Sequence, residues 1–184
     1  MLFSSFLPAS VTDPDFSRLA LLDAILLDFQ IAFPDLHFEL RLDRKVINAQ
    51  AILLDDSRCV LIYGGLALHP SLAEASLTFA LLHEAGHHLA TGPRLPFNVS
   101  LKCDCAADHW ARTEGAETLR RVSGRQLQIA AALQQLDCLM SEPGDVSNFS
   151  EDSSMCWNRR WSDRKQGISA GCSPTKCELM RPVL

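Results

Sequence analysis

An apolar run from Leu72 to Leu89 constrains the fold more than any other segment of this 184-residue chain. Its length and its bulky apolar residues predict a long helix that is largely buried. His83 and His87 lie four positions apart near its end, so both imidazoles emerge from one helical face. Gly86 lies inside the same helix, where glycine costs about 1 kcal/mol relative to alanine. We therefore expect another part of the chain to pack closely against the backbone at Gly86.

Glu84 completes the pattern His-Glu-x-x-His, which indicates a particular chemistry. Two histidines one helical turn apart can bind zinc, and the carboxylate beside the first of them can reach a water in the open coordination position. The pattern therefore predicts metal-assisted hydrolysis, most often of a peptide bond. A surface helix with solvated His and Glu is the alternative. The apolar flanks Phe79–Leu82 and Leu89–Ala90 argue against it, because ionisable groups on a buried helix need partners or a metal.

A catalytic zinc needs a third protein ligand, and the stretch from Cys103 to Ala111 offers several candidates. Asp104 and Asp108 share one face of a predicted helix, so one carboxylate can bind the metal while the other accepts a hydrogen bond from a ligand histidine. The thiols of Cys103 and Cys105 are also good zinc ligands, although on a helix each points about 100° away from the Asp104 side chain. Ordinary buried thiols are the alternative role of both cysteines.

These residues resemble the ImmA/IrrE metallopeptidases, a gluzincin-like family in which His-Glu-x-x-His precedes a helix of the form Glu-x-x-Ala-Asn-x-Phe-Ala. The resemblance covers Leu36 to Ala111, and Asp104–Ala111 is the stretch that matches the second helix. Asp104 falls at the family's glutamate ligand, and Asp108 falls at its asparagine. The resemblance implies a zincin-like fold, a catalytic zinc and a protein substrate. That substrate is commonly a transcriptional repressor, with a role in stress response or in control of mobile elements.

The family pattern is not matched in full, because Asp104 is one methylene shorter than the glutamate ligand. Either the second helix comes closer to the first, or another residue is the third ligand. Cys105 and Asp108 are the rivals for that position. We predict Asp104.

The predicted site combines zinc ligands with groups that handle protons and negative charge. Glu84 is the expected general base, which takes a proton from the attacking water and passes it to the leaving amine. Tyr63, the only tyrosine, and His109 are candidate donors to the oxyanion, although each could be purely structural. The predicted zinc ligands are His83, His87 and Asp104.

Composition and charge exclude several other classes of protein. An apolar content of 47% in 184 residues supports one domain with a full core, and a net charge of −5 argues against nucleic-acid binding. The chain shows neither a basic leader nor a long unbroken apolar run, so we expect neither secretion nor membrane insertion. Seven cysteines without a secretion signal predict a cytoplasmic protein with mostly free thiols.

The order of expected elements predicts an α+β fold in which a small, mainly antiparallel sheet packs on helices. Gly115 and Gly124 should separate helices. An edge strand could bind a substrate peptide by strand addition, but the sequence does not reveal which strand is the edge. We expect a metallopeptidase domain over residues 1–141 and a mostly irregular tail over 142–184. The expected elements are helix 12–33, strand 36–42, a hairpin of 46–54 and 58–63 about the turn 55–57, and helices 71–90, 103–113 and 125–141.

Two rival hypotheses remain open. In the first, the protein is a non-catalytic, zinc-stabilised interaction module, in which four side chains hold the metal and the exposed sheet edge binds a partner. In the second, the same scaffold hydrolyses small amides or esters. A deep closed pocket would favour the small substrate, whereas a long open groove would favour a peptide.

Overall fold

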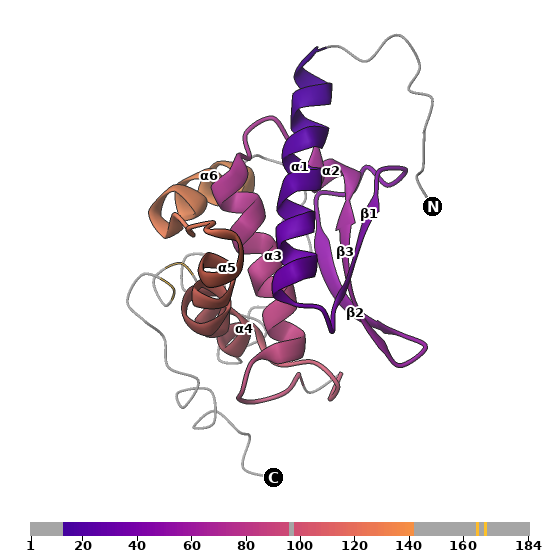
Figure 1. Ribbon diagram of the computed structural model, residues 1–184, viewed down its shortest axis with the longest axis vertical. Helices are drawn as coiled ribbons and strands as arrows, with labels where there is room; N and C mark the ends of the chain where they lie inside the picture. The colour runs from indigo at the N-terminus through magenta and orange to yellow at the C-terminus, as the bar shows by residue number, and fades with distance from the viewer. Residues whose placement is uncertain (1–12, 96–97, 142–164, 166–167, 169–184) are drawn as a thin grey trace.

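The computed structural model describes residues 13–95, 98–141, 165 and 168, and these residues form an α+β fold (Figure 1). The elements in chain order are α1 (Asp13–Ala32), β1 (His37–Arg41), β2 (Ala49–Leu54), β3 (Ser57–Tyr63), α2 (Gly64–Ala67), α3 (Glu74–Leu89), α4 (Asp104–Trp110), the π-helical segment η1 (Ala111–Gly115), α5 (Ala116–Ser123) and α6 (Ile129–Ser141). The predicted helices and the three predicted strands are all present within a few residues of their expected bounds. The short helix α2 was not predicted.

Helix α3 lies at the centre of the described structure. Figure 1 shows it between the sheet on one side and α4, α5 and α6 on the other, with α1 crossing in front. Its side chains are buried on both of these sides; Leu77, Phe79, Leu81, Leu82 and Ala85 are at most 2% exposed. The prediction of a long buried helix is therefore confirmed.

The sheet is mixed, so the prediction of a mainly antiparallel sheet was wrong. Its strand order is β1-β3-β2, with β1 parallel to β3 and β2 antiparallel to β3. The chain leaves β1, crosses to the far side of β3 and returns as a hairpin. Hydrophobic alternation within one strand carries no information about this crossing, because it reports only which face of the strand is buried. The crossing makes β2 an edge strand of the sheet.

The predicted hairpin between β2 and β3 is confirmed, with a tighter turn than expected. Leu54 lies opposite Ser57, so only Asp55 and Asp56 form the turn. Their φ angles are 48° and 65°. Positive φ at both positions suits the twist of a two-residue hairpin, and Asp is among the few residues other than glycine that tolerate it. Ser57, which was predicted to lie in the turn, is the first residue of β3.

Gly115 does not separate two helices, contrary to the prediction. The chain stays helical from Asp104 to Ser123 and passes through η1 on the way. A Cβ atom at Gly115 would lie 2.5 Å from Cζ3 of Trp110, so the glycine leaves room for the indole ring. The same ring packs against Phe33 at the end of α1, with 5.4 Å between centroids. Gly124, with φ of 75°, ends α5 as predicted.

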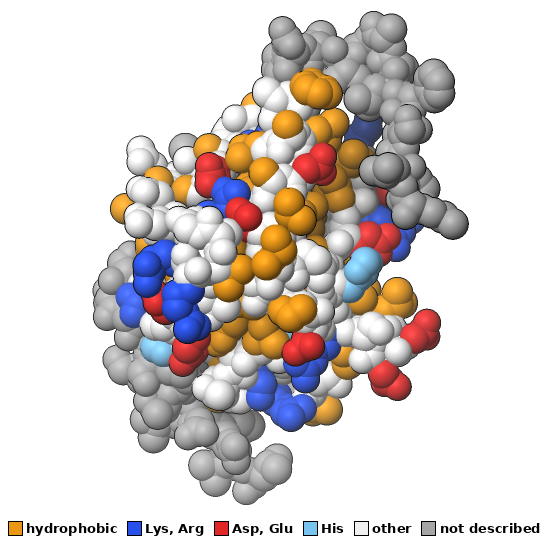
Figure 2. Space-filling view, in the orientation of Figure 1, with side chains coloured by type: hydrophobic (Ala, Val, Ile, Leu, Met, Phe, Trp, Pro, Cys, Tyr) orange, Lys and Arg blue, Asp and Glu red, His pale blue; other side chains and the backbone are white. Residues whose placement is uncertain are grey.

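The exposed face of α1 is unusually apolar for a surface helix. Figure 2 shows apolar side chains along it, and Phe16, Leu27 and Ile31 are 57%, 62% and 59% exposed. None of the described helices combines the length and the apolar character needed to cross a membrane. The predicted cytoplasmic location remains a prediction from the sequence.

Most of the predicted tail lies outside the described residues, and so does the proposed domain boundary after residue 141. Two of its residues are described. Ile168 is 3% exposed and its carbonyl accepts a hydrogen bond from Arg112 at 2.9 Å. Lys165 forms an ion pair with Asp137 of α6.

Gly115→Ala tests the packing of Trp110. Helix propensity alone would make this change stabilising by about 1 kcal/mol. The added methyl group would overlap the indole ring, so we expect a net loss of about 1–3 kcal/mol in the free energy of unfolding, measured by urea denaturation. Glu114→Ala, at the exposed neighbouring position, should change it by less than about 0.5 kcal/mol. A stabilised Gly115→Ala protein would contradict the packing seen here.

Candidate metal centre

His83 and His87 direct one ring nitrogen each toward the same point. Helix α3 places them one turn apart, as predicted, and their Nε2 atoms are 3.1 Å from each other. Both residues are buried, with 8% exposure. Two imidazole nitrogens at this separation need a proton or a metal ion between them, because their lone pairs would otherwise repel each other.

Acceptors hold the other ring nitrogen of each histidine. His83 Nδ1 lies 2.8 Å from Oδ1 of Asp108, and His87 Nδ1 lies 2.6 Å from the carbonyl oxygen of Lys102. A carbonyl or an ionised carboxylate only accepts, so these contacts favour the proton on Nδ1 of each ring. The Nε2 atoms are then left with lone pairs, which is the form in which histidine binds a metal.

Asp104 brings a third donor atom to the same point. Its Oδ1 lies 3.5 Å from His83 Nε2 and 3.8 Å from His87 Nε2. Ligand atoms held tetrahedrally at about 2.0–2.2 Å from a zinc ion would be about 3.3–3.6 Å apart. The three separations in this triangle, 3.1, 3.5 and 3.8 Å, bracket that value. The donor set therefore fits a zinc ion, and two nitrogens with one oxygen is a ligand combination typical of catalytic zinc.

The geometry favours Asp104 over Asp108 as the third ligand. Asp108 is 4% exposed and contacts the Nδ1 side of His83, opposite the side that faces His87. It can therefore orient His83, as one of the two carboxylates on this helix was expected to do. Cys103 and Cys105 are both buried, and their roles as ligands or as ordinary thiols remain predictions.

Asp104 reaches the histidines because α3 and α4 touch backbone to backbone. A Cβ atom at Gly86 would lie 2.8 Å from the carbonyl oxygen of Ala107 and 2.9 Å from its Cα. Only glycine allows an approach this close. The close packing predicted at Gly86 is confirmed, and it accounts for how a side chain as short as that of Asp104 reaches the two histidines.

Glu84 lies between the histidines and the sheet. Its Oε2 accepts a hydrogen bond from the Ala51 amide of β2 at 2.8 Å. Its carboxylate and the rings of His83 and His87 can each offer one ligand atom within 4.8 Å of the others. Glu84 is thus close enough to act on a molecule bound at the centre, while β2 holds its side chain from the other side.

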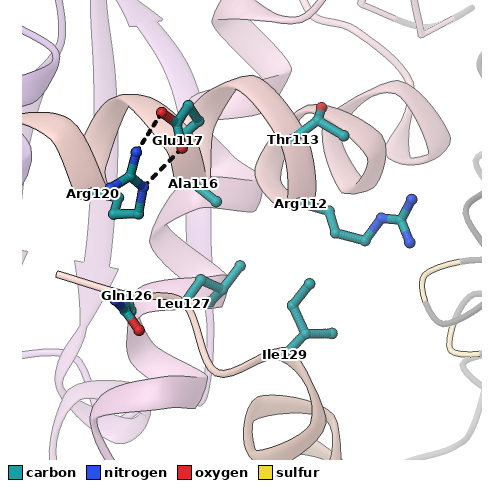
Figure 3. Close-up of a pocket in the computed structure, with 8 residues that line it drawn as sticks. All are labelled: Arg112, Thr113, Ala116, Glu117, Arg120, Gln126, Leu127 and Ile129. Carbon is teal, nitrogen blue, oxygen red and sulfur yellow. Dashed lines mark hydrogen bonds and ion pairs between the residues drawn. The ribbon is translucent and has the colours of Figure 1, made fainter.

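A cavity of about 600 Å³ opens beside this centre. Helix α3 contributes Glu84 and His87 to its lining, and β2 contributes Ala49–Leu53. The opposite wall comes from the loop after α3, through Leu95, Asn98 and Leu101. A second cavity, of about 400 Å³, lies between η1–α5 and residues 126–129 (Figure 3). It is lined by none of the predicted site residues, and Arg120 and Glu117 at its rim bind each other.

Neither candidate oxyanion donor lines the cavity beside Glu84. The hydroxyl of Tyr63 donates to Oε1 of Gln50 at 3.2 Å. Gln50 lines the cavity and Tyr63 does not. His109 is half-buried on α4, where its carbonyl accepts from the Thr113 hydroxyl. The proposed role of Tyr63 and His109 remains a prediction.

His88 points away from the point that His83 and His87 share, as expected. Its Nε2 contacts the Cys59 carbonyl at 3.0 Å, and burial lowers the pKa of its imidazole.

Two contacts of the site were not foreseen, the Lys102 carbonyl at His87 and the Ala51 amide at Glu84. Both are backbone groups, so no pattern of side chains could have revealed them.

No protein-family model matches the chain, and neither a curated protein nor a solved structure matches it. Membership of the ImmA/IrrE family therefore remains a prediction that rests on the two motifs.

Zinc content tests the centre directly. The purified protein should hold about one zinc per chain, measured by mass spectrometry of the metal, because its ligands are already placed on adjacent helices. The His83→Ala/His87→Ala protein should hold none and should melt at a lower temperature. His109→Ala removes a histidine of α4 outside the triangle and should keep its zinc. Stoichiometric zinc in the double variant would refute the assignment.

The two aspartates should differ in their effect on zinc affinity. Asp104→Ala removes a ligand and should abolish tight binding, whereas Asp108→Ala removes only support for His83 and should weaken binding by about 10–100-fold. Asp108→Asn keeps an oxygen that can accept from Nδ1, so it should bind more tightly than Asp108→Ala. Competition with a chromogenic chelator measures all three. Normal affinity in Asp104→Ala together with loss in Cys105→Ala would identify the thiol as the ligand.

Proposed function

We propose that this protein is a zinc-dependent hydrolase that cleaves peptide bonds in a protein substrate. The observation that carries the proposal is the convergence of His83 Nε2, His87 Nε2 and Asp104 Oδ1 on one point, with Glu84 beside it. Three acceptors that meet in a mostly buried position favour a bound cation over any neutral partner. Three protein ligands leave one tetrahedral position open, which is typical of a catalytic rather than a structural zinc.

The chain's own groups would divide the chemistry among them. A zinc ion held by His83, His87 and Asp104 would supply a water of lowered pKa, about 7, and a positive charge for the substrate carbonyl. Glu84 would accept the proton from that water and later deliver it to the leaving amine. The Ala51 amide would hold the Glu84 carboxylate in place, and Asp108 and the Lys102 carbonyl would hold the two rings.

The position of Glu84 bears on the rival interpretation as an interaction module. A purely structural zinc would use four side chains, and Glu84 is a candidate for the fourth, because one of its ligand atoms lies within 4.8 Å of those of both histidines. Its hydrogen bond to Ala51 directs the carboxylate toward the wall of the cavity, where a substrate would lie. This supports a role as base rather than as ligand.

The sheet edge supports a peptide substrate over a small amide or ester. Strand β2 is at the edge of the sheet and forms one wall of the cavity next to Glu84. An edge strand offers backbone groups to an extended chain, which a small substrate would not use. The resemblance to ImmA/IrrE makes a transcriptional repressor the first substrate to test.

Glu84→Gln separates catalysis from metal binding. The amide keeps the side-chain shape but cannot take up a proton at neutral pH, so turnover should fall by roughly 10²–10⁴-fold while zinc and folding are kept. The assay is clearance of a candidate repressor co-expressed with each variant. Glu114→Gln makes the same chemical change at an exposed position and should match the parent protein.

Three outcomes would change the assignment. Unaltered clearance by Glu84→Gln would exclude Glu84 as the base. Loss of zinc from that variant would make Glu84 a ligand. Binding of the repressor by both proteins without cleavage by either would favour the interaction module.

A further inference from the structure

The cavity beside Glu84 has two walls that differ in what they offer a bound chain. One wall is the edge of β2, from Ala49 to Leu53. The other is the narrow loop after α3, in which Leu95 and Leu101 are bonded to each other through their backbones at 2.9 Å. This loop is tied to the centre itself, because the Lys102 amide donates to the His87 carbonyl at 2.8 Å.

The β2 wall offers backbone hydrogen bonds. The Tyr63 amide donates to the Asn48 carbonyl at 3.1 Å, so these two residues form a hydrogen-bonded pair of the antiparallel ladder. Because such pairs alternate along the ladder, the backbone groups of Ala49, Ala51 and Leu53 point away from β3. The Ala51 amide already reaches Glu84, which confirms this direction. Ala49 and Leu53 therefore present equivalent groups on either side of the base, in the orientation that an added strand requires.

The side chains of the cavity offer little to a charged chain. Among the described residues that line it, Glu84 is the one Asp, Glu, Lys or Arg. An acidic segment would meet Glu84, with Asp104 close by on the other side of the histidines, and would find no basic partner among those same lining residues. Among these described residues, a basic segment would find an opposite charge only in Glu84, whose carboxylate already accepts a hydrogen bond from the Ala51 amide. Apart from Glu84 and His87, the lining side chains are apolar or neutral. They are those of Ala49, Gln50, Ala51, Ile52, Leu53, Leu95, Asn98 and Leu101.

We propose that this cavity binds an extended, uncharged segment of another protein, and that Leu53, Leu95 and Leu101 select an apolar side chain within it. Ala49 and Leu53 pair with the backbone of the segment, which places it alongside Glu84. This inference rests on the proposed function, because the bound segment would be the substrate of the hydrolysis. Binding of the segment can be measured without turnover, so an experiment can refute the binding and the hydrolysis separately.

A peptide-display selection tests the proposal. The probe is the full zinc-loaded chain with Glu84→Gln, which prevents cleavage and keeps an oxygen for the Ala51 amide. Random peptides that bind should be enriched in Leu, Ile, Val, Met or Phe at one position and poor in charged residues around it, because the described lining of this variant holds no Asp, Glu, Lys or Arg to pair with them. Fluorescence anisotropy with the selected peptides then gives their dissociation constants.

Two exposed leucines of β2 provide a matched pair of variants. Leu53 is 42% exposed and lines the cavity, whereas Leu54 is 51% exposed and does not. Leu53→Lys places a charge where the apolar side chain is expected to bind. Affinity for the selected peptides should therefore fall about tenfold or more, because the bound apolar side chain would no longer be buried against leucine. Leu54→Lys adds the same charge on the neighbouring residue and should stay within about twofold.

Each result bears on the proposal. Selection of acidic or basic peptides, or of none, would overturn it, and so would equal effects of Leu53→Lys and Leu54→Lys. A synthetic peptide of residues 1–12, which carry no charged side chain, is included as a competitor. If that peptide binds more tightly than every library peptide, the occupant is this chain itself and the assignment to another protein is wrong. Apolar peptides that bind as expected but resist cleavage by the parent protein would uphold this inference and refute the proposed hydrolysis.

Discussion

The contact between Gly86 and Ala107 is the constraint on which the candidate centre depends. A side chain at position 86 would hold α3 and α4 apart, because a Cβ there would lie only 2.8 Å from the Ala107 carbonyl oxygen. Both aspartates of the site come from α4, and each side chain is short. At this helix separation Asp104 reaches the Nε2 side of His83 and Asp108 reaches its Nδ1 side. One close backbone approach thus places both the proposed third ligand, Asp104, and the carboxylate that contacts the other side of His83.

Burial of the polar groups of the candidate centre opposes folding, and the rest of the fold must offset this free energy. Asp104, Asp108 and the two histidines bring negative charge and lone pairs into a region that is largely removed from water, and such burial is unfavourable on the order of several kcal/mol without compensation. A bound cation would supply that compensation, so metal binding and folding should be coupled. The apolar core around α3 carries the remainder of the stability, with Ile25, Phe29, Val60 and Leu82 fully buried.

Helix α3 links the centre to its surroundings on three sides. Toward α4 it presents His83 and His87, and toward β2 it presents Glu84, whose carboxylate accepts a hydrogen bond from the Ala51 amide. At its end, His87 and Lys102 are joined by two hydrogen bonds, one from the Lys102 amide and one to its carbonyl. Glu84, the two histidines and both walls of the cavity are therefore attached to one helix, which would suit the positioning that the proposed hydrolysis requires.

The sequence by itself determined the features that depend on local spacing. Periodicity and turn residues located the main helices and the β2–β3 hairpin, the four-residue spacing placed His83 and His87 on one face, and the cost of a helical glycine pointed to close packing at Gly86. Tertiary structure decided the parallel pairing of β1 with β3, the continuous helix through Gly115, and which aspartate faces the Nε2 atoms. It also supplied the backbone partners from Ala51 and Lys102. The physical reason is that spacing encodes only which residues share a face. Strand order, helix separation and the direction of a backbone amide arise when distant segments pack together.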